Sequence, residues 1–372
     1  MSTLDADTGG AAGLVSAEAA AELAQPAGGA GGVPWVRLVV GLVIAAVALY
    51  LPFYYGPDTN KLLSQAIYLA VAAQGLNLLT GFNGQVSIGH GAFFGVGAFT
   101  TGILMTEYGW YFEPTIIVAA VVAALVGVVI GFPALRVRGL YLALITLGLA
   151  VLFPRLASKV VDGPDAIFQG SGGVALLRPE RSEFESLVGW LENDQWEYFL
   201  CLGIAVLGYV MARNLINSRM GRAIIATRDR EIAAATVGVN LSGVKVGTFA
   251  ISAAYAGVAG SLAVMVDKVA DATNPILYFE LSIKFLVAVV IGGAATILGP
   301  ALGAVVLTFL EDRTDTLIEG KEVLSPALLG IALIIIVFVL PEGLLGGIRR
   351  LVNKVSTRWA GRKRSADGVN RS

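Results

Sequence analysis

The feature that most limits the fold of this chain is an uncharged stretch of 45 residues, Leu62–Thr106, which contains the only histidine, His90. As one α-helix it would be about 65–70 Å long, roughly twice the hydrocarbon thickness of a bilayer. The stretch must therefore fold back, and residues 81–91, rich in glycine and hydrogen-bonding side chains, are the place for the turn. Irregular backbone at membrane depth is stable only when it is buried in protein or faces water. We therefore predict that this segment lines a solute path.

The composition supports a membrane protein and excludes several other classes. Hydrophobic residues make up 56% of the chain and charged residues 14%, whereas soluble domains contain about 25% charged residues. The net charge of −1 argues against a nucleic-acid partner. The sequence has no phosphate-binding loop, so another subunit must bind ATP if ATP is used, and we expect no cofactor in this chain. The single cysteine, Cys201, allows no intrachain disulfide and no cysteine–histidine metal cluster.

The pattern of apolar runs predicts an all-α polytopic membrane protein with about ten membrane segments. We expect a disordered acidic tail at 1–33, a transmembrane domain at 34–346 and a basic cytoplasmic tail at 347–372. The predicted spans are 36–55, 62–80, 90–106, 114–135, 139–154, 199–212, 246–266, two arms within 285–310, and 323–341.

The basic residues predict the orientation, because Lys and Arg are enriched in short cytoplasmic loops. They occur at Arg136 and Arg138, in the loop 213–245, and in the C-terminal tail, whereas the loop 159–197 is net acidic. This places both termini in the cytoplasm and 159–197 outside.

The same orientation requires the uncharged run 285–310 to enter and leave the membrane on one face. Its bend is expected at 292–300, where Gly and Pro can interrupt a helix. Each arm then is too short to cross fully, which predicts a re-entrant pair or two short helices. Two interrupted segments in corresponding halves of a membrane protein are typical of a transport site.

Hydrogen-bonding side chains gather around the first interruption and are the candidate substrate-path residues. They are Asn77, Asn83, Gln85, Ser87 and His90. An alternative is that His90 only bonds a neighbouring helix. The glycines nearby follow small-xxx-small spacing, which favours close helix packing rather than chemistry: Gly91 with Gly95, Gly97 with Thr101, Ala253 with Gly257 and Ser261, and Gly299 with Gly303. We find no convergent catalytic set and expect no enzyme activity.

The cytoplasmic loop contains a second pattern, at 218–240. It predicts a basic amphipathic helix, a short Ala-rich helix and a glycine stop at Gly238, although an ordinary solvated loop is the alternative. The pattern resembles the coupling loop of ABC importer permeases, whose general form is Glu-Ala-Ala, three residues, then Gly. Ala233, Ala234 and Gly238 fit that form, while Glu231 stands one place early.

Together with Gly75–Gly81 and Gly84–Phe94, this loop resembles the branched-chain amino acid ABC transporter permeases of the LivM and LivH type over roughly residues 60–345. The resemblance implies a plasma-membrane (inner-membrane) importer with a homologous second permease, two cytosolic ATPases that bind the ATP, and an extracytoplasmic substrate-binding protein. The residues expected to contact the ATPase are Arg222, Arg228, Glu231, Ala233, Ala234 and Gly238. Acidic residues in the outer loop are expected to contact the binding protein, because charge can orient a partner. These are Glu180, Glu183 and Glu185. The alternative is that this loop is a lid or spacer without a partner.

Other functions remain open at this point. Permeases for urea and short amides share the architecture and a similar Ser-Ile/Leu-Gly-His element. A proton-coupled secondary transporter would place several ionisable residues within its spans, and these are nearly absent. A channel would not need the charged coupling loop, and a membrane enzyme would need a catalytic set.

Overall fold

The structure is a computed structural model that describes residues 34–135, 140–161, 176–177, 191–274 and 276–317, with scattered positions between 330 and 347. The chain divides into two units, one formed by Leu51–Val352 and the other by Met1–Tyr50 with Asn353–Ser372. In the second of these, the described part is most of the helix α2 (Pro34–Tyr54). Everything below concerns Leu51–Val352.

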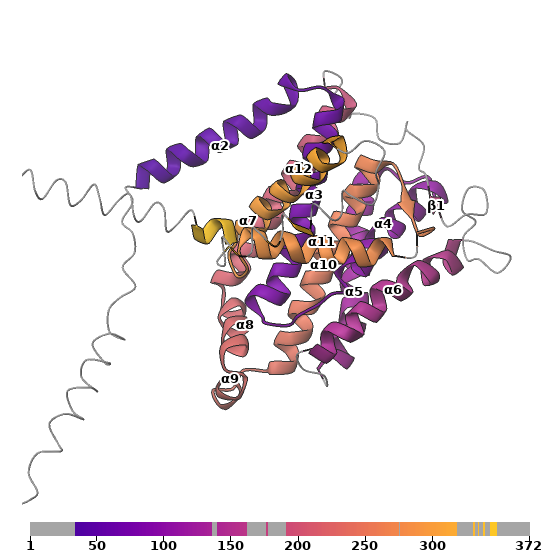
Figure 1. The fold of residues 1–372 in the computed structure, drawn as a ribbon. Coiled ribbons are helices and arrows are strands. Elements are labelled where there is room, and N and C mark those ends of the chain that lie inside the picture. The colour runs from indigo at the N-terminus through magenta and orange to yellow at the C-terminus, as the bar shows by residue number, and fades with distance from the viewer. Residues whose placement is uncertain are drawn as a thin grey trace, which may run out of the picture. The chain divides into compact units, whose positions relative to one another are not determined.

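The described part of this unit is almost entirely helical (Figure 1). Its helices are α3 (Pro57–Leu76), the π-helix η1 (Asn77–Phe82), α4 (His90–Thr106), α5 (Phe112–Ala134), α6 (Leu140–Val161), α7 (Asn193–Asn217), α8 (Arg219–Asp229), α9 (Glu231–Thr236), α10 (Leu241–Asp267), α11 (Leu277–Gly292) and α12 (Gly299–Leu317). The strands β1 (Leu176–Leu177) and β2 (Ala270–Asp271) form one short antiparallel pair.

Helix length supports a multi-pass membrane protein. Within the described ranges, five helices are long and apolar enough to cross a membrane: Pro57–Phe82, Phe112–Pro133, Tyr141–Val160, Asn193–Asn217 and Leu241–Asp267. This agrees with the predicted all-α membrane class, and the total of about ten segments stays a prediction.

Helix α10 is the centre of the bundle and packs against α3, α4 and α5. Small residues allow this approach: a Cβ atom on Gly97 of α4 would collide with the backbone of Gly257, and one on Gly257 would lie 2.5 Å from Cβ of Ala123 in α5. Thr101 also donates a 2.7 Å hydrogen bond to Ser261 across the same contact. The small-xxx-small residues on these helices therefore are packing surfaces, as predicted.

Several predicted boundaries were wrong in the same direction, because the helices continue past the charged residues at which the predictions ended. Helix α7 has 25 residues, and the two arms around the second bend have 16 and 19, or about 24 and 28 Å. The arms are therefore longer than predicted. Lys284 and Glu311, which extend them, form a 3.1 Å ion pair with each other, so two charges enter the helices as a neutral pair.

Some predictions fall outside the described residues. These are the basic pair Arg136 and Arg138, the tails 1–33 and 347–372, nearly all of the loop 162–190 and nearly all of the span 323–341.

Candidate functional site

Two helix interruptions lie at the predicted places. After η1, residues 83–89 are not helical, Gly84 has a φ of +74°, and α4 begins at His90. The second interruption separates Gly292, the end of α11, from Gly299, the start of α12. We call residues 83–89 the first break and residues 293–298 the second break. Both predicted interruptions, near 81–91 and 292–300, are confirmed.

Asn77, the first residue of η1, ties the π-helix that leads into the first break to the second break. Its side-chain Nδ2 donates to the Thr296 carbonyl at 2.7 Å, and its Oδ1 accepts from the Ala295 amide at 2.9 Å. Gly81 makes the approach possible, because a Cβ atom there would lie 2.6 Å from the Ala295 nitrogen. The Asn77 side chain was predicted to face the solute, but the structure places it between the breaks as a clamp.

Four other side chains near the first break are buried and have no hydrogen-bond partner for one or more polar atoms within the described chain. They are Gln74, Asn83, Ser87 and His90. A buried polar group without a partner is costly, so such groups concentrate where water or a ligand supplies the missing bond. Gln85 differs, since it donates a long 3.4 Å bond to the Lys245 carbonyl.

His90 lies where α3, α4 and α11 meet. Its Nε2 would be 3.3 Å from a Cβ atom on Gly75, so the missing side chain at Gly75 makes room for the imidazole. The ring centroids of Phe93 and Phe285 lie 6.1 and 6.2 Å from the imidazole, in edge-on geometry. Polar and aromatic groups therefore occupy one buried position.

Hydroxyl groups from neighbouring helices fix the backbone on either side of this position. Thr146 of α6 accepts from the Ile88 amide at 3.1 Å, and Ser282 of α11 accepts from the Gly91 amide at 2.8 Å. Ser252 of α10 donates to the Gly75 carbonyl at 2.6 Å.

These hydroxyls, and Gln74, were missed from the sequence. A single Ser or Thr in an apolar helix often bonds only its own helix backbone. Only the fold shows which of these hydroxyls contact the first break. Gln74 had a usable signal, because it precedes Asn77 by three residues and so lies on a neighbouring part of the same helical surface.

The loop predicted to couple to the ATPase forms the two expected helices, α8 and α9, next to the N-terminal end of α10 (Figure 1). Ser218 caps α8 by accepting from the amides of Met220 and Gly221 at 3.1 and 3.3 Å. Gly238 follows α9 with a φ of +86°, which suits glycine, so the predicted stop is confirmed.

Three of the predicted coupling residues contact other parts of their own chain, although Arg228 is also exposed. Arg228 donates from Nη1 to the Gly81 carbonyl at 3.1 Å, and Glu231 forms a 2.6 Å ion pair with Lys245 of α10. Ala234 is also buried in its own chain, with 3% of its surface exposed. These three contact the permease itself, which corrects the prediction that Ala234 belongs to a face presented outward.

The outward surface of α9 and its C-terminal cap is mostly apolar. Ile232 and Val237 are 82% and 79% exposed, and Ala233, one of the predicted coupling residues, is exposed between them. Arg222 of α8 is exposed too. An apolar pair so exposed at the end of a membrane bundle is typical of a contact surface.

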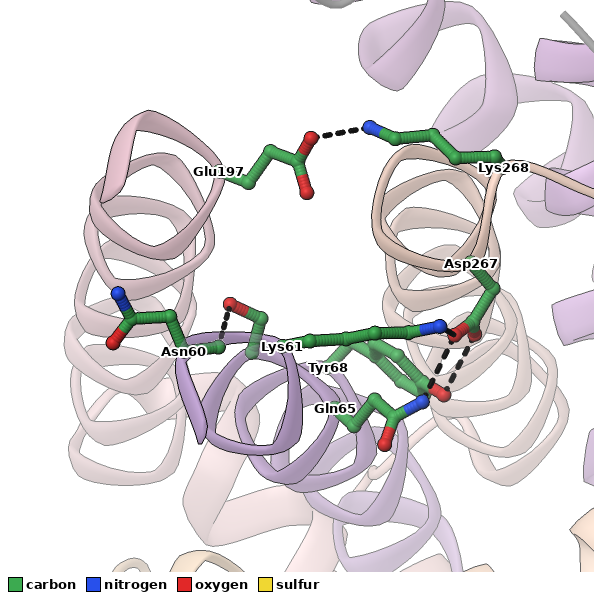
Figure 2. Close-up of polar contacts among 8 residues, drawn as sticks. Asn60, Lys61, Gln65, Tyr68, Glu197, Asp267 and Lys268 are labelled. Carbon is green, nitrogen blue, oxygen red and sulfur yellow. Dashed lines mark hydrogen bonds and ion pairs between the residues drawn. The ribbon is translucent and has the colours of Figure 1, made fainter. Parts of the chain in front are cut away.

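The start of α3 and the end of α10 carry a network of polar contacts (Figure 2). This is the end of α10 that lies away from α8 and α9. Gln65 and Tyr68 donate to the Asp267 carboxylate at 2.9 and 3.1 Å, Lys61 lies 3.7 Å from it, and Lys268 bonds Glu197 of α7. A cavity of about 310 Å³ adjoins this network. The sequence did not predict it, and the predicted docking residues Glu180, Glu183 and Glu185 lie outside the described residues.

Residues 59–337 match the family described as "Branched-chain amino acid transport system / permease component". The chain belongs to this family. The matched residues include both breaks and the helices α8 and α9.

Two curated relatives agree with this assignment. The permease is 29% identical to the high-affinity branched-chain amino acid transport system permease protein LivM of Escherichia coli (strain K12), over 82% of this chain and 74% of the relative. It is 26% identical to LivH of the same strain, over 74% of this chain and 91% of the relative. No solved structure matches the chain.

Proposed function

We propose that this protein is the permease subunit of an ABC importer that moves branched-chain, hydrophobic amino acids into the cell. The LivM and LivH relatives are described as permeases for that substrate class. The observation that carries the proposal is the connection between the two breaks. Asn77 of η1 bonds the second break, buried side chains without partners in the described chain lie near the first, and Arg228 of a surface helix bonds the η1 turn that leads into the first break.

The chemistry of the first break suits a zwitterion with an apolar side chain. Gln74, Asn83, Ser87 and His90 offer donors and acceptors without a fixed carboxylate or ammonium group, and Phe93 and Phe285 add apolar surface beside His90. A solute that loses its hydration shell here regains hydrogen bonds from these groups. Because the set contains no carboxylate, ammonium or guanidinium group, we expect binding that is weak enough for the solute to leave.

The sequence and the family together lead us to propose the other subunits of the transporter. It contains no phosphate-binding loop, so ATP would be bound by two cytosolic ATPase subunits, and Ile232, Ala233 and Val237 supply an apolar surface for one of them. A homologous second permease would complete the path, and an extracytoplasmic binding protein would deliver the substrate. In this arrangement α8 and α9 are cytoplasmic, both termini lie inside, and the chain resides in the bacterial inner membrane.

The test is reconstitution of the permease with its transporter subunits in proteoliposomes and measurement of labelled leucine uptake. We expect uptake that needs ATP and the binding protein, and that excess isoleucine and valine suppress. A matched sample with a hydrolysis-inactive ATPase is the control. Uptake of urea or a short amide in place of leucine would assign the other permease class, and uptake without ATP would contradict the ABC mechanism.

A further inference from the structure

Arg228, at the end of α8, packs onto the membrane part of the permease. Its Nη1 donates to the Gly81 carbonyl at 3.1 Å, and its Nε bonds Asp229 at 2.9 Å. A Cβ atom on Gly84 would lie 2.9 Å from Cγ of Arg228, so the stem of the arginine covers the first break where the chain has a positive φ. The guanidinium therefore caps one of the carbonyls left open at the end of η1.

The element that Arg228 caps is unusual. Residues 77–82 form a π-helix directly after α3, whereas the helices around it are α-helical. The π-helix is a rare conformation and occurs frequently at functional sites. A π-turn can also shift its hydrogen bonds by one residue to become α-helical, which makes η1 a candidate for a segment with two arrangements.

Asn77, at the other end of η1, continues the connection. The side-chain amide of Asn77 bonds Ala295 and Thr296, which are 218 and 219 residues away in the sequence. A shift of η1 would therefore act on the second break. From α8 to the second break there is thus one hydrogen-bonded series: Arg228, Gly81, η1, Asn77 and the loop at 295–296. A weaker parallel route exists, from Glu231 through Lys245 to Gln85.

We propose that Arg228 and Asn77 are positioning residues that pass displacement of α8 to both breaks through the π-turn η1. The proposal rests on the proposed function, since it supposes that an ATPase moves α8. It also changes the expected role of Arg228, from a contact with the ATPase to a contact with the solute path.

The test compares Arg228→Gln with Arg219→Gln in the reconstituted transporter. Both residues are arginines of α8, but no described contact ties Arg219 to a break, and Arg219 is not among the residues expected to contact the ATPase. ATP hydrolysis and leucine uptake are measured on the same vesicles. We expect Arg228→Gln to lower uptake per ATP about tenfold, the size usual for loss of one hydrogen bond from a charged group, while hydrolysis continues. Arg219→Gln should keep the original ratio.

A second variant tests whether the two residues act in series. Asn77→Ala should lower uptake per ATP as well, and the double variant should be no worse than the more affected single variant. Multiplied losses would overturn the series. Equal loss of hydrolysis and uptake in Arg228→Gln would overturn it too, because that result indicates a contact with the ATPase.

A measurement on the unaltered transporter avoids any failure of the variants to fold. Hydrogen exchange with nucleotide trapped in the ATPases should change in residues 77–89 and 293–298 together. A change confined to α8 and α9 would overturn the linkage. An unaltered transporter that takes up no amino acid contradicts the proposed function, whereas an intact ratio in Arg228→Gln contradicts only the linkage.

Discussion

The two breaks lie together, yet different parts of the chain fix them. The first break is bonded by side chains from outside it, with Thr146 of α6 accepting from its backbone and Ser282 of α11 accepting just beyond it. The second break is held partly by its own residues: Thr296 donates to the Gly293 carbonyl at 2.6 Å and accepts from the Gly299 amide at 3.1 Å, while Asn77 bonds it from η1.

The partnerless polar atoms show the same division. Within the described residues, Asn83, Ser87 and His90 at the first break have such atoms, and the second break has none. The first break thus has an anchored backbone and free side chains, which is the arrangement expected of a binding surface. The second is a loop with its own internal hydrogen bonds, and Asn77 of η1 positions it. We therefore expect the first break to contact the solute and the second break to shape the path.

The contact between the breaks should be the most sensitive point. Gly81→Ala introduces a Cβ atom 2.6 Å from the Ala295 nitrogen and against the Asn77 oxygen, so backbone must move. We expect a loss of about 3 kcal/mol of unfolding free energy, the upper end for overpacking. Thermal unfolding of the purified permease measures it.

Gly148→Ala is the matched control, because a Cβ atom on Gly148 in α6 meets nothing within 4 Å. Alanine there should be neutral or stabilise by up to about 1 kcal/mol. Equal melting temperatures for the two variants would show that the breaks do not depend on each other's approach.

The clamp itself should come next in size. Asn77→Ala leaves the Ala295 amide and the Thr296 carbonyl without their partner, which should cost about 2 kcal/mol. Asn83→Ala removes an equal side chain whose amide atoms have no partner, so it should cost clearly less. The two melting temperatures decide whether Asn77 stabilises the pair of breaks, and a larger loss in Asn83→Ala would reverse the assignment.

Local sequence was sufficient to predict the breaks and insufficient to predict how they meet. Glycine and polar residues in an apolar run indicate where a helix stops, so 81–91 and 292–300 were identified correctly. The bond from Asn77 to Thr296 joins positions 219 apart, and no local pattern contains it. For the same reason Asn77 was grouped with the free polar side chains around it.

The coupling helices teach a similar lesson at shorter range. Their helical pattern and the stop at Gly238 follow from the sequence, but the direction of each side chain depends on how α9 lies on α10. Ala234 faces inward and Ile232 outward, which six residues of helix cannot indicate by themselves. The ends of α11 and α12 were misplaced because Lys284 and Glu311 looked like boundaries until the fold paired them.

The smallest predicted effect gives the sharpest comparison, because one substitution should act in opposite ways at two nearby positions. Ser282→Ala removes the acceptor of the Gly91 amide and should lower the unfolding free energy by about 1 kcal/mol. Ser87→Ala removes a buried hydroxyl that has no partner in the described chain, so unfolding free energy should stay equal or rise slightly.

Uptake should show the reverse order. If the Ser87 hydroxyl bonds the solute, its loss should raise the KM for leucine about three- to tenfold, as for one hydrogen bond of about 1 kcal/mol, while Ser282→Ala leaves KM unchanged in the folded fraction. Such opposite results would distinguish side chains that stabilise the first break from side chains that contact the solute there. A lower unfolding free energy in Ser87→Ala with unchanged KM would mean that the Ser87 hydroxyl stabilises the fold. That result would contradict solute contact at the first break.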